Sequence, residues 1–132
     1  MSAVRQLRLV LTVDDFDAAV AMYCDALGLE EREAWEASAE NGRIVILEAG
    51  RATLELVNEE QAAAIDAIEV GSRVAGAVRI AFEVDDSAAS AARLEQAGAE
   101  RLGGPVVTPW QDRNVRLRVS GGMQLTLFSS GA

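Results

Sequence analysis

The 132-residue chain contains no histidine. Imidazole is the usual general base near neutral pH and the commonest nitrogen ligand of transition metals in proteins. Its absence excludes Ser-His-Asp and Cys-His catalysis and every histidine-based metal centre. The chemistry that remains is that of carboxylates, arginines, amides and a single tyrosine.

Cysteine, long apolar runs and positive charge are also scarce. The one cysteine, Cys24, cannot form an internal disulfide, and its place in a helical pattern indicates a small buried side chain rather than a reactive thiol. No stretch of about 18 apolar residues exists, and residues 1–8 are polar, so we expect no membrane association and a soluble, cytoplasmic protein. The net charge of −9 disfavours nucleic acid as a partner.

An internal repeat is the most informative feature that is present. The triplet VDD occurs at Val13 and again at Val84, 71 residues later, and at the same offset Arg8 falls on Arg79. After a small gap, the triplet around Glu55 falls on the triplet around Gln124. Two copies of one structural module are the economical explanation.

Each half predicts the order βαβββ. Apolar alternation marks the strands, aspartates cap the helices, and Gly28 and Gly98 end them. A short helix with an acidic, alanine-rich sequence and a glycine-containing linker connect the halves. The expected strands are 7–13, 29–37, 43–49, 51–57, 78–84, 100–107, 113–119 and 123–128, and the expected helices are 14–28, 58–68 and 86–97. Glycines and a proline at 103–105 interrupt the strand 100–107 and leave its boundary open.

Length and composition bound the architecture. A chain of 132 residues with 50% hydrophobic content supports one core, so we expect a single domain over residues 1–132. Module one covers residues 4–58, a linking helix and linker cover 58–77, and module two covers 77–130. The predicted fold class is α+β, with two tandem βαβββ modules whose twisted sheets curl around a shared cavity.

Period-two alternation assigns the strand residues to two faces. One face is apolar and should pack on the helices: Leu9, Leu11, Val13, Leu54, Leu56, Ile80, Phe82, Val84, Val115, Leu117, Val119, Leu125 and Leu127. The other is mainly polar: Arg8, Thr12, Thr53, Glu55, Arg79, Glu83, Arg116, Arg118, Gln124 and Thr126. Such a face either meets solvent, as antiparallel sheets often allow, or lines a cavity between the two modules.

Four segments carry a family resemblance: LRLVLTVDDFDAAVAMYCDALGLE, ATLELVN, VRIAFEVDD and MQLTLF. They resemble the sheet signatures of the vicinal oxygen chelate superfamily, which includes glyoxalase I, extradiol dioxygenases, fosfomycin-resistance proteins and bleomycin-binding proteins. The resemblance extends from Leu7 to Phe128 and implies paired βαβββ modules. It also implies a homodimer, which the small size of one two-module core favours.

The resemblance implies a metal site that this chain lacks the residues to build. Metal-dependent members carry a histidine in the first strand of each half and a carboxylate in the last strand. The matching positions here are Arg8, Glu55, Arg79 and Gln124. A guanidinium is cationic and has no lone pair to give, so we expect no metal and no cofactor.

Two interpretations of the arginines stay open. Arg8, Glu55 and Arg79, with Gln124 as a hydrogen-bonding filler, can form a structural ion cluster in place of the metal. Alternatively, the excess positive charge, increased by Arg116 and Arg118, binds a small anionic or polar molecule. In that case Trp110, Trp35 or Phe128 supplies apolar walls, although each aromatic residue can equally be a core or dimer contact.

The sequence therefore predicts a metal-independent protein that binds or sequesters an anionic or polar organic molecule or drug. The alternative is a metal-free lyase or isomerase, with Glu55 as the best candidate for a general base and an arginine stabilising an oxyanion. Adjacent arginines favour the ionised carboxylate and oppose that alternative.

Overall fold

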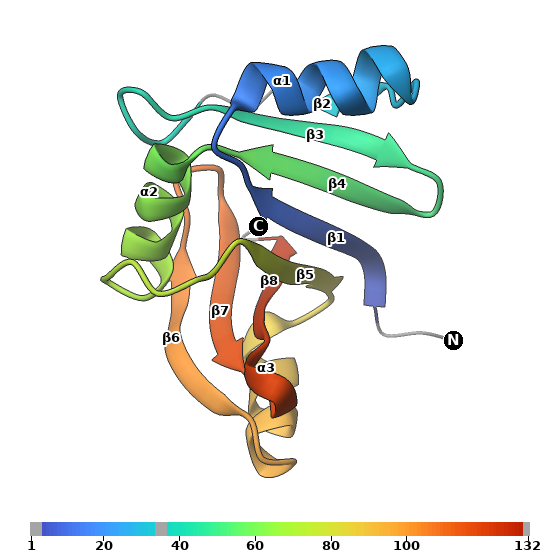
Figure 1. Cartoon of the computed structure of the whole chain (residues 1–132). Helices are drawn as coiled ribbons and strands as arrows, with labels where there is room; N and C mark the ends of the chain where they lie inside the picture. Colours follow the sequence, from blue (N-terminus) through green and yellow to red (C-terminus); the bar gives the residue numbers. More distant parts are fainter. Residues whose placement is uncertain (1–3, 34–36, 131–132) are drawn as a thin grey trace.

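The computed structural model describes residues 4–33 and 37–130 and contains one curled, unclosed sheet of eight strands (Figure 1). The strand order is β2-β3-β4-β1-β5-β8-β7-β6. The strands are β1 Val4–Thr12, β2 Glu31–Glu33, β3 Ile44–Ala49, β4 Ala52–Val57, β5 Val78–Val84, β6 Glu100–Val107, β7 Asp112–Arg118 and β8 Gln124–Ser130. The helices are α1 Phe16–Val20, continued by a π-helical segment Ala21–Ala26, then α2 Glu59–Glu69 and α3 Ser87–Gln96, and a 3-10 turn covers Ser120–Gly122.

The two βαβββ modules predicted from the repeat are present, and the sheet order is symmetric about its centre. β1 pairs in parallel with β4, β5 pairs in parallel with β8, and β1 and β5 join the halves as antiparallel neighbours. Each half therefore contributes four strands in the same spatial order. The polar faces of both halves consequently turn toward one concave side.

The helices begin where the aspartates and an asparagine predict. The side chains of Asp15, Asn58 and Asp86 each accept a hydrogen bond from the backbone three residues on, which satisfies one unpaired N–H of the first turn. The helix after β1 changes to π-helical spacing at Ala21 and ends before Gly28, which has φ of +88°. Glycine adopts this left-handed conformation without steric penalty.

The convex face has two apolar cores rather than one. α1 and the π-helical segment pack on Leu47, Leu54 and Leu56, whereas the core around Leu117 and Leu127 lies in the other half. The helices cover less of the centre of the sheet, between these two cores. The prediction that all residues on this face bury against helices is therefore wrong at Leu9, 37% exposed, because β1 and β5 lie between the surfaces that α1 and α3 cover.

Helix α2 contacts β4, β6 and β7, and its approach explains the glycines in β6. A Cβ atom on Gly103 would lie 2.0 Å from the backbone oxygen of Glu69, so only glycine lets the end of α2 come this close. Gly104 has φ of +92°, and its Cβ would lie 2.4 Å from the backbone oxygen of Asn114. β6 therefore continues through the interruption as one strand with shifts of register, Glu100–Val107.

No helix within the described parts of the chain combines the length and the apolarity that crossing a membrane requires.

Candidate functional site

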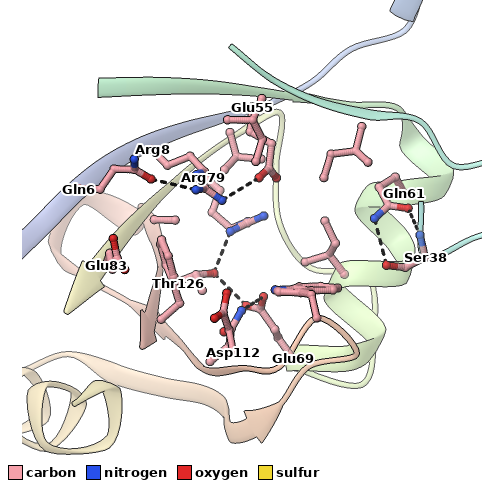
Figure 2. A pocket seen from close by; sticks show the side chains of 18 of the residues that line it. Gln6, Arg8, Ser38, Glu55, Gln61, Glu69, Arg79, Glu83, Asp112 and Thr126 are labelled. Carbon is pink, nitrogen blue, oxygen red and sulfur yellow. Dashed lines mark hydrogen bonds and ion pairs between the residues drawn. The ribbon is translucent and has the colours of Figure 1, made fainter. Parts of the chain in front are cut away.

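The concave side of the sheet holds a cavity of about 260 Å³ (Figure 2). Strands of both halves, α2 and the loop that carries Trp110 surround it. Its lining residues are Gln6, Arg8, Val10, Arg32, Ser38, Ile44, Ile46, Glu55, Gln61, Ile65, Glu69, Arg79, Ala81, Glu83, Trp110, Asp112, Asn114, Thr126 and Phe128.

Five of the residues predicted for the site line this cavity: Arg8, Glu55, Arg79, Trp110 and Phe128. Three others do not: Arg116 and Gln124 lie in the buried network described below, and Arg118 lies at the surface, where its Nη1 is 2.9 Å from Glu100 Oε1. Trp35 lies outside the described residues.

Arg8 on β1 is held by three polar neighbours. Its Nε donates to Thr53 Oγ1 at 3.3 Å, its Nη2 donates to Gln6 Oε1 at 2.8 Å, and its Nη1 lies 3.5 Å from Glu55 Oε1. The guanidinium also lies over the ring of Phe128, 5.1 Å from the ring centroid. This position is within the range of a cation–π contact. These contacts hold the Arg8 side chain in place on the wall of the cavity.

Glu55 on β4 is a buried carboxylate with few polar contacts. It is 6% exposed, and Arg8 at 3.5 Å is its one polar contact among the described residues. Burial raises the pKa of Glu55, and the nearby Arg79 and Arg8 guanidiniums counter this only in part. The adjacent arginines favour the ionised carboxylate, as expected, but loss of hydration has the larger effect on its pKa.

Arg79 on β5 projects its guanidinium into the middle of the cavity (Figure 2). It is 7% exposed, and its Nη1 donates to Thr126 Oγ1 at 2.8 Å. Its Nε and Nη2 have no hydrogen-bond partner in the part of the chain that the structure describes. Burial lowers the pKa of Arg79, against the attraction of Glu69, yet an arginine remains protonated in proteins.

The strand register corrects the residue that matches Glu55 in the second half. Glu55 lies beside Val10 of β1, and Thr126 lies beside Ala81 of β5. Val10 and Ala81 are related by the 71-residue repeat, and so are Glu55 and Thr126. Thr126, rather than Gln124, is the counterpart of Glu55, so the gap introduced in the sequence comparison is not needed.

Two carboxylates of α2, Glu69 and Asp66, contact residues of the site. The sequence comparison of the two halves does not include them. Glu69 is 3% exposed; its Oε1 accepts from Arg116 Nε at 3.0 Å and from Thr126 Oγ1 at 2.8 Å, and its Oε2 accepts from Asn114 Nδ2 at 3.0 Å. A continuous chain of hydrogen bonds thus runs from Arg79 through Thr126 to Glu69.

Asp66, one turn earlier on α2, completes this buried network. Arg116 is fully buried, and its Nη1 donates to Asp66 Oδ1 at 2.8 Å and to Gln124 Oε1 at 2.9 Å. Asp66 Oδ2 accepts from the backbone N–H groups of Val74 and Ala75, both at 2.8 Å, and from Arg73 Nη1 at 3.0 Å. Burial acts to raise the pKa of Asp66, but these N–H groups and Arg116 together hold it below its usual range.

Guanidiniums and carboxylates lie together at the site. The buried Arg79 and Arg116 and the partly buried Arg8 accompany three buried carboxylates: Glu55, Glu69 and Asp66. Arg32, which is exposed, and Glu83 and Asp112, which are half-buried, also line the cavity. The excess of positive charge expected from the sequence is therefore cancelled by α2.

The donor set does not fit a metal ion. The positions at which metal-dependent relatives are expected to hold their ligands contain two guanidiniums, one carboxylate and one hydroxyl: Arg8, Arg79, Glu55 and Thr126. Two fixed cations there would repel a divalent ion, and one carboxylate with one hydroxyl falls short of a ligand shell. No group of three or more His, Cys, Asp or Glu residues that could hold an ion occurs within residues 4–33 and 37–130.

Sequence reasoning missed Glu69, Asp66 and Thr126 for different reasons. Thr126 carried a usable signal, because the unmodified 71-residue offset places it on Glu55. The α2 carboxylates carried none, because their helix belongs to neither copy of the repeat. An acidic helix in a sequence is most often a solvated one.

Residues 5–124 match the sequence model of the Glyoxalase/Bleomycin resistance protein/Dioxygenase superfamily. The chain belongs to this superfamily. No curated protein matches the chain.

Solved structures share the fold. Methylmalonyl-CoA epimerase of Streptomyces coelicolor, solved with 2-nitronate-propionyl-CoA, has a TM-score of 0.70 and 24% identity, covering 99% of this chain and 100% of that one. The epimerase of Mycobacterium tuberculosis has a TM-score of 0.70 and 20% identity, with coverage of 100% and 92%. A superfamily member from Vibrio splendidus has a TM-score of 0.63 and 11% identity, with coverage of 95% and 98%. At these identities the likeness concerns the fold alone.

Proposed function

We propose that this superfamily member binds a small polar organic molecule in the cavity without the help of a metal ion. The observation that carries the proposal is the guanidinium of Arg79, buried, central and with donors left over after its bond to Thr126. A buried polar group of this kind is stabilised when a bound molecule completes its hydrogen bonds.

The apolar walls support an organic molecule rather than a bare inorganic ion. Trp110 and Ile44 pack against the buried cluster of Val10, Ile65 and Phe128, and all of them line the cavity. Ligand sites commonly combine such apolar walls with a few convergent polar groups. The cavity volume, about 260 Å³, lies just below the usual range for ligand sites and favours a small ligand.

A second candidate function is metal-free lyase or isomerase chemistry. Burial raises the pKa of Glu55, which makes this carboxylate a better proton acceptor than an exposed one. The neighbouring Arg79 could stabilise an oxyanion formed when a proton is removed. The acyl-CoA complex of the epimerase from Streptomyces coelicolor suggests thioesters as one substrate class to assay.

The test is to map fragment binding by ¹H–¹⁵N NMR in buffer with a chelator, using small neutral, anionic and cationic compounds. We expect shifts of backbone signals around Arg79, Trp110 and Phe128, and the same shifts after divalent ions replace the chelator. Binding that requires a divalent ion, or shifts confined to residues outside the cavity, would contradict the proposal. Proton exchange at the α-carbon of a bound thioester in deuterated water would support the second candidate.

We also propose a homodimer. Leu7, Leu9 and Val78 are each between 37% and 42% exposed on the convex side of the central strands, where contact with a second copy would cover them. Sedimentation equilibrium at micromolar concentration should give a mass near 28 kDa, twice the 14.0 kDa of one chain. A mass of one chain at all concentrations would contradict the dimer.

A further inference from the structure

We propose that the ligand has no net charge and carries both a hydrogen-bond donor, placed against Glu55, and an acceptor, placed against Arg79. This inference rests on the proposed binding function and narrows its class of ligand. Primary carboxamides and related neutral molecules have this chemistry. Simple carboxylates, phosphates and organic cations do not.

The first argument is the balance of buried charge. Glu55 and Arg79, the two groups that face the ligand, carry opposite charges. Arg8 lies 3.5 Å from Glu55, Arg116 pairs with Asp66 and Glu69 at 2.8 and 3.0 Å, and Arg79 reaches Glu69 through the hydroxyl of Thr126. A ligand with a net charge would leave one charge uncompensated beside these buried groups, which is costly. A neutral ligand leaves the balance intact.

The second argument is the pair of unfilled hydrogen-bonding capacities. An ionised carboxylate only accepts hydrogen bonds, and Glu55 has one long contact at 3.5 Å. A guanidinium only donates, and Arg79 uses Nη1 on Thr126 and leaves Nε and Nη2 for a ligand, counting the described residues. The two groups therefore require opposite partners, and one neutral molecule with a donor and an acceptor supplies both.

The third argument is the placement of the two groups. Glu55 and Arg79 both lie in register with Val10, one on each neighbouring strand, and all three side chains line the cavity. Neighbouring strands are about 4.8 Å apart, so the two backbones are separated by roughly 10 Å and the side chains converge above Val10. Figure 2 shows both reaching toward the same central space. A single small molecule lying over Val10 can touch both.

The experiment compares three probes of nearly identical shape: benzoate, benzamide and benzamidine, which carry charges of −1, 0 and +1 at pH 7. Dissociation constants come from ¹H–¹⁵N NMR titration of the unchanged protein, followed at signals from cavity residues. We expect benzamide to bind at least about tenfold more tightly than either charged probe, because each of those leaves one buried group unpaired.

Two substitutions test the assignment of the groups. Glu55→Gln removes one negative charge and should move the preference toward benzoate, whereas Arg79→Gln removes one positive charge and should move it toward benzamidine. Arg118→Gln is the matched control, because Arg118 pairs with Glu100 outside the cavity, and it should leave the order of the three probes unchanged. Far-UV circular dichroism and thermal melting check that each variant is folded.

The outcomes separate this inference from the proposed function. Equal binding of the probes, or a charged probe binding best, would overturn the neutral-ligand inference while a ligand-binding cavity stands. If no probe and no other fragment shifts cavity signals, both fail. The ranking in the unchanged protein decides the inference even where a variant does not fold.

Discussion

The two halves of the molecule use the same positions for different chemistry. Strand register places Ile46 beside Glu55 in the first half and Arg116 beside Thr126 in the second. The carboxylate of the first half thus lies beside an apolar residue, while the hydroxyl of the second half lies beside a buried cation. The difference shows that a repeated fold need not repeat its electrostatics.

Helix α2 accounts for the difference, because its charged side chains turn to one half. Asp66 and Glu69 both hydrogen-bond Arg116 and have no comparable partner among the described residues of the first half. A guanidinium can therefore be buried completely in the second half. In the first half the corresponding place needs an apolar side chain, and Ile46 is fully buried there.

Arg116→Ile is the strongest test of this comparison, because it gives the second half the residue of the first. We expect the free energy of unfolding to fall by about 3–5 kcal/mol, since Glu69 would stay buried without its cation and Asp66 would keep only Arg73. Urea denaturation measures the change. Ile46→Val, a modest change at the matching position, should lower the free energy of unfolding by only about 0.5–1.5 kcal/mol. Equal effects of the two substitutions would contradict the asymmetry.

Thr126→Val breaks the hydrogen-bond chain between Arg79 and Glu69 without changing the charge. The expected loss in the free energy of unfolding is about 1–3 kcal/mol, because buried donors and acceptors on both sides lose a partner. Thr53→Val removes the hydroxyl that Arg8 contacts at a longer distance, 3.3 Å, and should have a smaller effect. If Thr53→Val lowered the free energy of unfolding more than Thr126→Val, the hydrogen-bond chain through Thr126 would not be the main interaction that stabilises the buried arginines.

The pH dependence of stability should reveal Asp66. Its pKa is lower in the folded protein than in the unfolded chain, so its contribution is fully present above the unfolded value of about 3.9 and is lost as pH falls through the folded value. The free energy of unfolding should decrease by up to about 1.4 kcal/mol per pH unit in that window from this group alone. Urea denaturation between pH 2.5 and pH 6, chosen to span about this range, measures the slope. Asp66→Asn should reduce the slope, and an unchanged slope would assign the acid sensitivity to other carboxylates.

Arg118→Gln should have the smallest effect. The Arg118 side chain is 43% exposed and pairs with an exposed glutamate, so the expected change in the free energy of unfolding is within about 0.5 kcal/mol. Thermal melting at low and high salt measures it. A loss comparable with that of Arg116→Ile would show that β7 has a second essential arginine.

Much of the fold could be predicted from local pattern. Alternation defined the strands, and Asp15 and Asp86 cap α1 and α3 as expected, because capping depends on a few neighbouring residues. Arg8, Glu55 and Arg79 were placed on one face by the same alternation and meet at the cavity. These predictions succeeded because each needs only the period of a strand and the offset of the repeat.

The predictions about the site that were wrong concern residues whose surroundings depend on contacts between distant segments. Arg116 and Arg118 are two residues apart on one strand and share a face, yet one is fully buried and the other exposed, because α2 covers only the first. Periodicity cannot tell which stretch of a sheet face a helix will cover. Gly103 gave a hint, since a glycine within a strand signals a close approach of another backbone, but it does not name the segment.

The sequence by itself determined that this protein has two matched modules, a polar concave face and guanidiniums where the resemblance places imidazoles. These are properties of residue type, period and repeat, and no folding is needed to recognise them. The tertiary structure alone decided the charge of the cavity. It did so by bringing the carboxylates of α2 against Arg116, because electrostatic balance depends on distances of a few ångströms between residues about 50 positions apart in the chain.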